Sequence, residues 1–330
     1  MFKTLATIAA ALALGIVLLG AYVRLNDAGL GCPDWPGCYG HVGVPEAAAD
    51  IAKAESHFPG KPVEPHKAWL EMIHRYFATG LGLLIVILSV LAWRQRTPGT
   101  IPWLPTALVG VVIFQGMLGM WTVTLLLKPV IVSLHLIGGL TTFALLSVMA
   151  LRQTRISEGP AVKPALKTFA LVGLIALACQ IALGAWTSTN YAALACADFP
   201  LCQGQLLPQT DFAQGFHLFR ELGYTADGQL LSQTALTAIH WTHRIGAITV
   251  ATILLVLSSA LLRAPGLTRY GVALILALGV QLAIGISIVL WQLPLPLAVM
   301  HNGGAAILLF VLVAINTAVR TRPSLSRITE

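Results

Sequence analysis

Eight apolar runs, each long enough to cross a lipid bilayer, dominate the sequence. A helix needs about 20 mainly apolar residues to span the hydrocarbon core. Charged residues make up only 10% of the 330 residues, against about 25% in soluble domains. We therefore expect an all-α membrane protein with eight transmembrane helices. The runs lie near residues 4–23, 69–93, 103–124, 131–151, 165–187, 237–262, 269–291 and 297–319.

The first run also resembles a secretory signal peptide, because Lys3 precedes it. Its apolar stretch is of spanning length, and no small-residue cleavage site stands before Arg24. We interpret it as a retained helix. No Arg-rich organelle-targeting segment precedes it, so the expected location is a bacterial inner membrane.

The basic residues distinguish the two sides of the membrane. Twelve of the 20 Lys and Arg residues lie on the side of the termini with two acidic residues, whereas the other side holds 8 basic and 11 acidic residues. Cytoplasmic loops carry the excess of Lys and Arg. Both termini are therefore expected in the cytoplasm, and the long loops, roughly 24–68 and 188–236, outside. This distribution accounts for the net charge of +7 without a nucleic-acid partner.

The second half of the chain repeats the first. We predict two tandem four-helix bundles, residues 1–156 and 157–330, in the same orientation because each has an even number of spans. The matched residues, separated by 164 to 169 positions, are Cys32 and Cys196, Cys38 and Cys202, His74 and His243, and His135 and His301.

The four matched histidines lie at similar depths in apolar runs. Ionisable groups inside a membrane are costly and are usually functional, and paired neutral imidazoles suit a metal or haem iron. Glycine pairs at 138–139 and 303–304 follow two of them and would let a flat macrocycle approach the backbone. Histidines that only bond to helix backbones are the alternative. Zinc is a weaker one, because no carboxylate or thiolate cluster completes a tetrahedral site.

Charged side chains accompany the histidines. Arg75 and Arg244 each follow a histidine directly, and Arg24 ends the first run. Guanidinium groups bind carboxylates in a bidentate manner, so we expect these arginines to bind haem propionates. For Arg24, an interfacial side chain that reaches lipid headgroups is an equal alternative.

Glu71 distinguishes the first half from the second. It stands three residues before His74, on the same helix face, and His240 stands at that place in the second half. A carboxylate beside one site only is expected if one site alone performs chemistry. A solvated interfacial residue is the alternative for Glu71, and His240 fits an ordinary interfacial histidine equally well.

Each long loop carries a cysteine pair, Cys32 with Cys38 and Cys196 with Cys202. In an oxidising compartment a disulfide within each pair is the expected state, whereas a zinc site would show closer spacing and more ligands. Whether the bridges are structural or redox-active stays open. Cys179 lies in an apolar run, and we expect it to be a small core residue.

Together these residues resemble the haem A synthase family over nearly the whole chain. The resemblance rests on the eight runs, the two halves, Leu-Gly-Cys-Pro-Asp-Trp-Pro at 30–36, Glu-x-x-His-Arg at 71–75 and the four histidines. It implies oxidation of the ring D methyl of haem O to a formyl group by successive hydroxylations. His74 and His135 would serve the substrate haem, His243 and His301 would ligate a haem b cofactor, and Glu71 would be catalytic or position the substrate.

Two other functions compete with this interpretation. A di-haem membrane cytochrome, carrying electrons between quinol and a periplasmic partner, would explain four histidines but not the single Glu71. A transporter is suggested only by the repeat and would not need paired histidines. Haem O synthase is a candidate partner for the predicted enzyme, and the sequence leaves open whether the chain forms a homo-oligomer.

Overall fold

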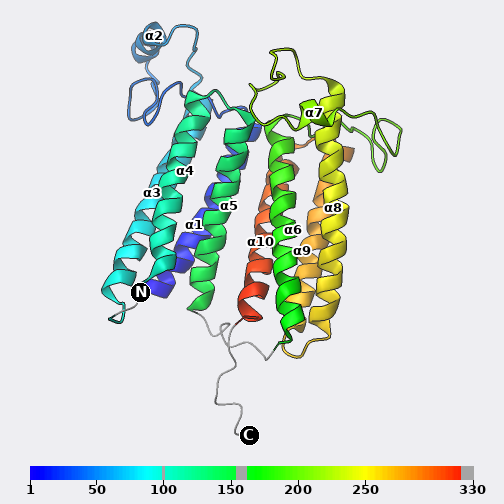
Figure 1. Cartoon of the computed structure of the whole chain (residues 1–330). Helices are drawn as coiled ribbons and strands as arrows, with labels where there is room; N and C mark the ends of the chain where they lie inside the picture. Colours follow the sequence, from blue (N-terminus) through cyan, green and yellow to red (C-terminus); the bar gives the residue numbers. More distant parts are fainter. Residues whose placement is uncertain (99–100, 154–161, 321–330) are drawn as a thin grey trace.

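Long helices dominate the computed structural model, which describes residues 1–98, 101–153 and 162–320 (Figure 1). Within this part, the elements outside helices are loops and three isolated β-bridges. Eight helices are long and apolar enough to cross a membrane, which confirms the predicted all-α class and the predicted spans. They are α1 (Phe2–Leu25), α3 (Pro65–Arg94), α4 (Trp103–Thr124), α5 (Pro129–Arg152), α6 (Pro164–Thr189), α8 (Gln233–Leu262), α9 (Thr268–Leu290) and α10 (Leu295–Ala318).

Local sequence explains where several helices begin. The helices α3, α5, α6 and α10 have proline at the first or second position, where its fixed φ suits a helix and its missing N–H has no partner to lose. At α8, the Ser232 side chain accepts a hydrogen bond from the Ala235 amide, a favoured N-cap. The first turns of α3 and α8 extend beyond their apolar runs, towards the loops that hold α2 (Ala48–His57) and α7 (Phe212–Gly215).

Helix contacts join the spans into two sets of four. In the first half, α1 and α4 each contact both α3 and α5, and in the second half α6 and α9 each contact both α8 and α10. Each set therefore closes in the same order. The predicted boundary between the halves, at residues 156 and 157, lies outside the described residues.

Three helix pairs connect the two sets: α1 with α10, α5 with α6, and α5 with α10. In the repeat, α1 corresponds to α6 and α5 to α10. The first two contacts are therefore equivalent, and the third joins a helix to its own counterpart. Such an arrangement is expected for parallel repeats related by an axis along the membrane normal.

Small residues make the centre of this arrangement compact. Ala6, Ala9 and Ala13 of α1 are at most 2% exposed, and α1 contacts α3, α5 and α10. Helices in membranes approach closely where small residues face one another. The alanines therefore let α1 pack closely both against α3 and α5 of its own set and against α10 of the other set.

The repeat extends to backbone conformation. Among the described residues, those other than glycine with positive φ fall into pairs separated by 164 or 166 positions, and each half has one cis proline peptide, at Pro36 and Pro200. Several pairs share no side-chain type, so the backbone repeats where the sequence does not. The pairs are Asp27 and Tyr191, Tyr39 and Gln203, Leu126 and Gln292, and Leu127 and Leu293.

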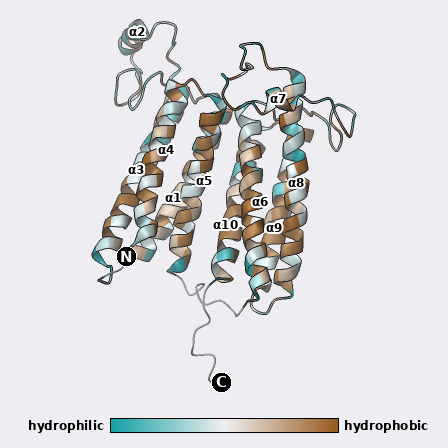
Figure 2. Ribbon diagram, viewed as in Figure 1, coloured by the Kyte–Doolittle hydropathy of each residue, from teal (hydrophilic) through white to brown (hydrophobic). Residues whose placement is uncertain are grey.

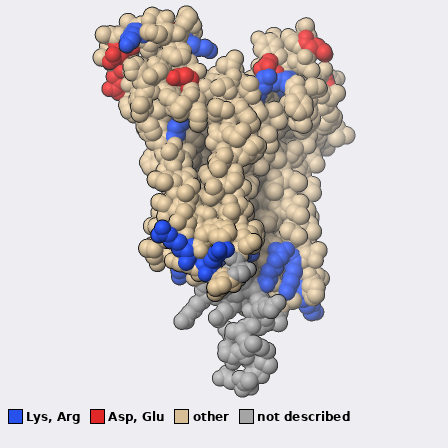
Figure 3. All heavy atoms as spheres, turned by 60° about the vertical axis from the view of Figure 1, so that its left-hand side comes forward, with Lys and Arg blue, Asp and Glu red and all other residues tan. Residues whose placement is uncertain are grey.

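Hydropathy and charge follow the helix axes. Figure 2 shows hydrophobic residues along the length of the helices and hydrophilic residues mainly at their ends and in the loops. On the face shown in Figure 3, basic side chains gather at the end opposite α2 and α7, and the acidic ones lie at the loop end. Which end faces the cytoplasm stays a prediction.

Candidate functional site

The four histidines lie within about three turns of the loop end of α3, α5, α8 and α10. In the first half, His74 of α3 and His135 of α5 face each other from helices on opposite sides of their set. Their ring centroids are 6.4 Å apart and the ring planes meet at 71°. The structure thus brings together the first pair that the sequence singled out.

This separation fits two imidazoles on opposite sides of one metal ion. A metal–imidazole bond is about 2.0 Å long, which places the centroids of two opposed rings roughly 6–6.5 Å apart. Nδ1 of His74 is buried without a hydrogen-bond partner, and so is Nδ1 of His301 in the second half. A buried polar atom without a partner is costly, and a bound ligand would remove that cost. The described residues contain no cluster of three or more His, Cys, Asp or Glu suited to a metal ion.

Each histidine ring packs against a glycine on a neighbouring helix. A Cβ built on any of these glycines would lie 3.0 to 3.3 Å from the Cε1 atom of the ring, which is tighter than an ordinary contact. Any larger residue would therefore displace the ring. The pairs are Gly20 with His74, Gly119 with His135, Gly184 with His243 and Gly285 with His301.

Glutamines on neighbouring helices hold three of the four histidines. The amide Nε2 donates to the backbone oxygen of the histidine at 2.6 to 3.1 Å and lies 3.0 to 3.3 Å from a ring nitrogen. Oε1 of each glutamine is buried without a partner. The pairs are Gln115 with His135, Gln180 with His243 and Gln281 with His301.

Two of the glycines that follow His135 and His301 lie against glutamine side chains. A Cβ on Gly138 or Gly304 would collide with Oε1 of Gln115 or Gln281, respectively. These glycines admit a glutamine side chain, and the expectation that they provide room for a macrocycle is wrong for this pair. The Cε1 edges of the histidine rings lie instead against the glycines of the neighbouring helices.

Glu71 and His240 occupy the same structural position. Glu71, 5% exposed, accepts the Cys32 amide on Oε2 at 2.9 Å and pairs with Arg75 through Oε1. His240, 4% exposed, accepts the Cys196 amide on Nδ1 at 3.2 Å. Both side chains therefore fasten the first cysteine of a disulfide loop to a membrane helix, so the interpretation of either as a solvated interfacial residue is wrong.

Arg75 and Arg244 bind the same two loops from the helix side. Each donates to backbone oxygens of its loop, and Arg244 Nε also donates to His240 Nε2 at 3.3 Å. That either arginine also binds a haem propionate stays a prediction. The acceptors are Pro36 O and Gly37 O for Arg75, at 3.2 and 2.5 Å, and Leu201 O and Cys196 O for Arg244, at 2.8 and 2.7 Å.

Arg24 connects the two halves. Its guanidinium donates to Ser188 O at 3.1 Å, lies 3.6 Å from the Asp27 carboxylate and stacks 4.1 Å above the Tyr191 ring. The Tyr191 hydroxyl in turn donates to Asp27 at 2.8 Å. This arginine therefore has protein partners at the boundary between the halves, and its role towards a propionate stays a prediction.

Both predicted disulfides are present, Cys32–Cys38 and Cys196–Cys202, with Cα–Cα distances of 4.8 and 4.6 Å. Cys179 is a free thiol and is exposed. The prediction that Cys179 is a core residue is wrong. Apolar residues of a membrane helix face lipid as readily as the core, so its position in an apolar run did not indicate burial.

An aspartate closes each disulfide loop. Asp34 accepts the Tyr39 and Gly40 amides at 2.6 and 2.8 Å, and Asp198 accepts the amides of Gln203 and Gly204 at 2.7 and 2.8 Å. Hydrogen bonds from these amides, first that of Gly204, hold the pKa of Asp198 below its usual value.

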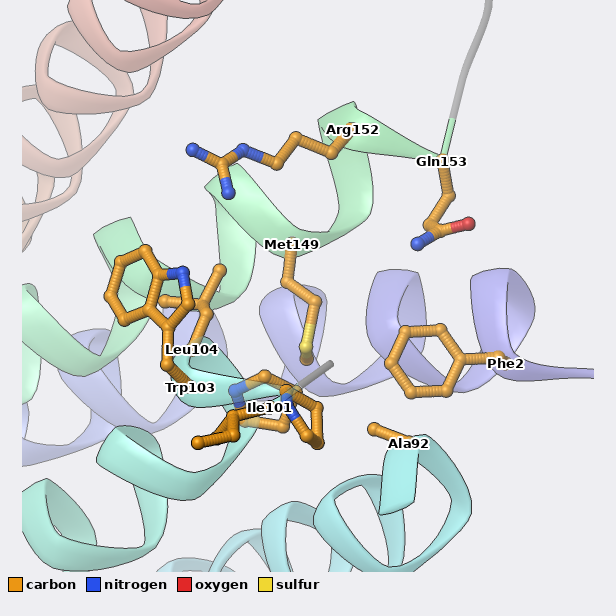
Figure 4. Close-up of a pocket in the computed structure, with 10 residues that line it drawn as sticks. Phe2, Ala92, Ile101, Trp103, Leu104, Met149, Arg152 and Gln153 are labelled. Atoms are coloured by element: carbon orange, nitrogen blue, oxygen red, sulfur yellow. The ribbon is translucent and has the colours of Figure 1, made fainter. Parts of the chain in front are cut away.

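A pocket of about 300 Å³ lies at the opposite end of the first half (Figure 4). Its lining includes Phe2, Trp103, Met149 and Arg152, and none of the four histidines. The largely apolar lining and its distance from the histidines separate this pocket from the candidate site.

The glutamines and ring-packing glycines escaped sequence reasoning, although a signal for some of them was present. Gln115 and Gln281 are 166 positions apart, as are His135 and His301. An uncharged amide in an apolar run is a weaker signal than a histidine, but a glutamine inside a membrane helix is expected to hydrogen-bond to another helix. The aligned repeat would have identified them.

Comparison with known proteins gives consistent matches. The COX15-CtaA family model, described as cytochrome oxidase assembly protein, matches residues 3–313. The chain is 46% identical over 303 residues to Heme A synthase of Shewanella oneidensis, covering 91% of both chains. Identity to Heme A synthase of Halalkalibacterium halodurans is 30% over 237 residues, covering 69% of this chain and 72% of the relative. For Heme A synthase of Caulobacter vibrioides it is 28% over 335 residues, covering 95% and 94%.

Proposed function

The chain belongs to the COX15-CtaA family of cytochrome oxidase assembly proteins, and from that premise we propose that it is a haem A synthase. The enzyme is a multi-pass membrane oxidoreductase that converts the ring D methyl of haem O to a formyl group. The similarity to Heme A synthase over 91% of the chain carries this conclusion. The opposed His74 and His135 rings supply a place for the substrate.

In this proposal the first half binds the substrate and the second half binds a cofactor. The first half takes haem O between His74 and His135. In the second half His243 and His301 would hold a haem b, which when bound would supply an electron-transfer path from the substrate site, its potential set by its ligands and surroundings. Support for the division comes from the buried carboxylate of Glu71, whose equivalent position in the second half holds His240.

Glu71 serves chemistry more than loop attachment. His240 fastens the second loop through the same cysteine amide, so a carboxylate is not needed for that purpose. Arg75 and the Cys32 amide fix the orientation of the carboxylate. A carboxylate positioned in this way can accept and return a proton as the methyl group is oxidised. Each of the two hydroxylations would insert one oxygen atom and require a two-electron oxidant from outside the chain; the geminal diol that results would lose water to form the aldehyde.

The disulfide loops are bonded to α3 and α8 through Glu71 and His240, three residues before His74 and His243, and we infer that they cover each site. Arg75 and Arg244, which directly follow His74 and His243 in the sequence, donate hydrogen bonds to backbone oxygens of the loops. We place this end at the outer face of the membrane, because basic residues gather at the other end. Haem O, with its apolar tail, reaches the first half from the bilayer, delivered by a haem O synthase.

Identification of the bound haems tests the proposal. Purified protein in lipid nanodiscs should contain haem B together with haem O or haem A, and added haem O should be converted to haem A. Haem B alone, without conversion, would support a di-haem electron carrier instead. Protein without any haem would contradict both haem functions.

A further inference from the structure

The four equivalent histidines differ in one respect that the proposed function does not use. His135, His243 and His301 each have a glutamine that bonds to the backbone oxygen and approaches the ring. His74 has none, because Ile16 stands on α1 where Gln180 stands on α6, 164 positions later. Ile16 and Gln180 are structurally equivalent, because four residues later on each helix Gly20 and Gly184 pack against Cε1 of His74 and His243.

A second substitution accompanies the first. The three glutamine side chains lie over a glycine three residues after the histidine, where a Cβ would collide with Oε1. These glycines are Gly138, Gly246 and Gly304. Three residues after His74 the chain has Phe77, which is 51% exposed. Both parts of the glutamine–glycine arrangement are therefore absent from His74.

The arrangement controls ring orientation. A side chain held beside a metal-bound histidine fixes the plane of its ring. The Nε2 of each glutamine donates to the backbone oxygen of its histidine and is thereby held 3.0 to 3.3 Å from a ring nitrogen, whereas Oε1 is buried without a partner. Among the described residues, no glutamine lies beside the His74 ring; its Nδ1 is buried without a partner, as is Nδ1 of His301, whose Nε2 is the atom that Gln281 approaches.

We propose that Gln115, Gln180 and Gln281 are positioning residues that fix three haem ligands, and that His74 is the ligand free to turn and release its haem. This inference rests on the proposed assignment of haem O to the first half. A cofactor haem benefits from two fixed ligands, His243 and His301. A substrate haem must enter and leave at each turnover, so one fixed ligand, His135, orients it and one unfixed ligand lets it go.

The test measures the rate at which each haem leaves the loaded protein for an excess of an apo-globin acceptor. Haem B reports on the second half, and haem O or A on the first, so one experiment follows both sites. Loss of an outer partner of a metal-bound histidine typically weakens metal affinity 10–100-fold. We therefore expect Gln180→Ile, which gives the second half the residue of the first, to release haem B about 10–100-fold faster.

The reciprocal variant completes the arrangement in the first half. Ile16→Gln with Phe77→Gly should slow the release of haem O or A, while Ile16→Leu should leave it unchanged. Gln180→Glu keeps the length of the side chain but removes the Nε2 donor to the His243 backbone oxygen, so it should also release haem B faster than the parent chain does. Equal haem B release from Gln180→Ile, Gln180→Glu and the parent chain would overturn the proposal. Because haem B release does not depend on conversion of haem O, this failure is distinct from failure of the proposed function.

Discussion

At the loop end of α3 a carboxylate, Glu71, accepts the amide hydrogen of Cys32, whereas at the same place on α8 an imidazole, His240, accepts that of Cys196. The two disulfide loops have the same backbone turns, the same aspartate and the same arginine contact. The comparison separates what holds a loop in place from what performs chemistry. Elements present in both halves are therefore candidates for structure and for haem binding, and elements of one half alone are candidates for catalysis or exchange.

The largest expected effect comes from removing a histidine in one half at a time. His243→Ala or His301→Ala should abolish the low-spin haem b signal in the reduced spectrum, because each supplies one axial bond. His74→Ala or His135→Ala should keep that signal and lose conversion of haem O. A haem b signal that survives in both second-half variants would reject the division between the halves.

Glu71→Gln tests the carboxylate with little change of size. Conversion of haem O to haem A should fall by roughly 10²–10⁴-fold, the usual loss for an acid–base group, while the haem b spectrum persists. Product is measured by haem extraction and chromatography.

Exchange of the equivalent residues sharpens this result. Glu71→His should keep the first loop attached, as His240 does in the second half, yet lose conversion to a similar extent. His240→Glu is the matched control and should leave conversion within about tenfold of the parent. Near-normal haem A production by Glu71→His would reduce Glu71 to a residue that holds the loop.

The disulfides should be equally closed in the two halves. Thiol labelling of the denatured, unreduced protein should modify Cys179 alone. Opening either ring by Cys→Ser pairs should lower stability by about 2 kcal/mol in the chain-entropy account of a short closed loop. Labelling at all five cysteines would contradict both the bridges and the assignment of the loops to an oxidising compartment.

The smallest effect concerns the pH dependence of the second loop. Because the pKa of Asp198 is lowered in the folded protein, its contribution to loop stability is present above pH about 4, the ordinary range of Asp. It is lost as the pH falls through the lowered value. The protection of the Gln203 and Gly204 amides from hydrogen exchange, relative to their intrinsic rates at each pH, should therefore fall in acid, and Asp198→Asn should remove this dependence. Protection that does not change with pH in the parent chain would refute it.

Apolar length and repetition made much of this molecule predictable. Span length predicted eight helices, and the position of Cys32 and Cys38 in a loop assigned to an oxidising compartment predicted a bridge that the structure contains. Side-chain contacts between helices could not be predicted from the sequence. Nothing local in the sequence shows that Gln180 reaches His243 or that Glu71 reaches the Cys32 amide, since both depend on how neighbouring helices are rotated. Cys179 was misread for the same reason.

The two-fold arrangement of α1 with α10, α5 with α6, and α5 with α10 has an evolutionary consequence. A surface that pairs equivalent helices in this way is the isologous interface of a homodimer, so a four-helix ancestor with that surface would have assembled as two identical chains. Gene duplication and fusion would then free each copy to specialise, one retaining its cofactor and the other exchanging its substrate. Expressed as separate polypeptides divided between α5 and α6, the present halves should still associate in the membrane and copurify.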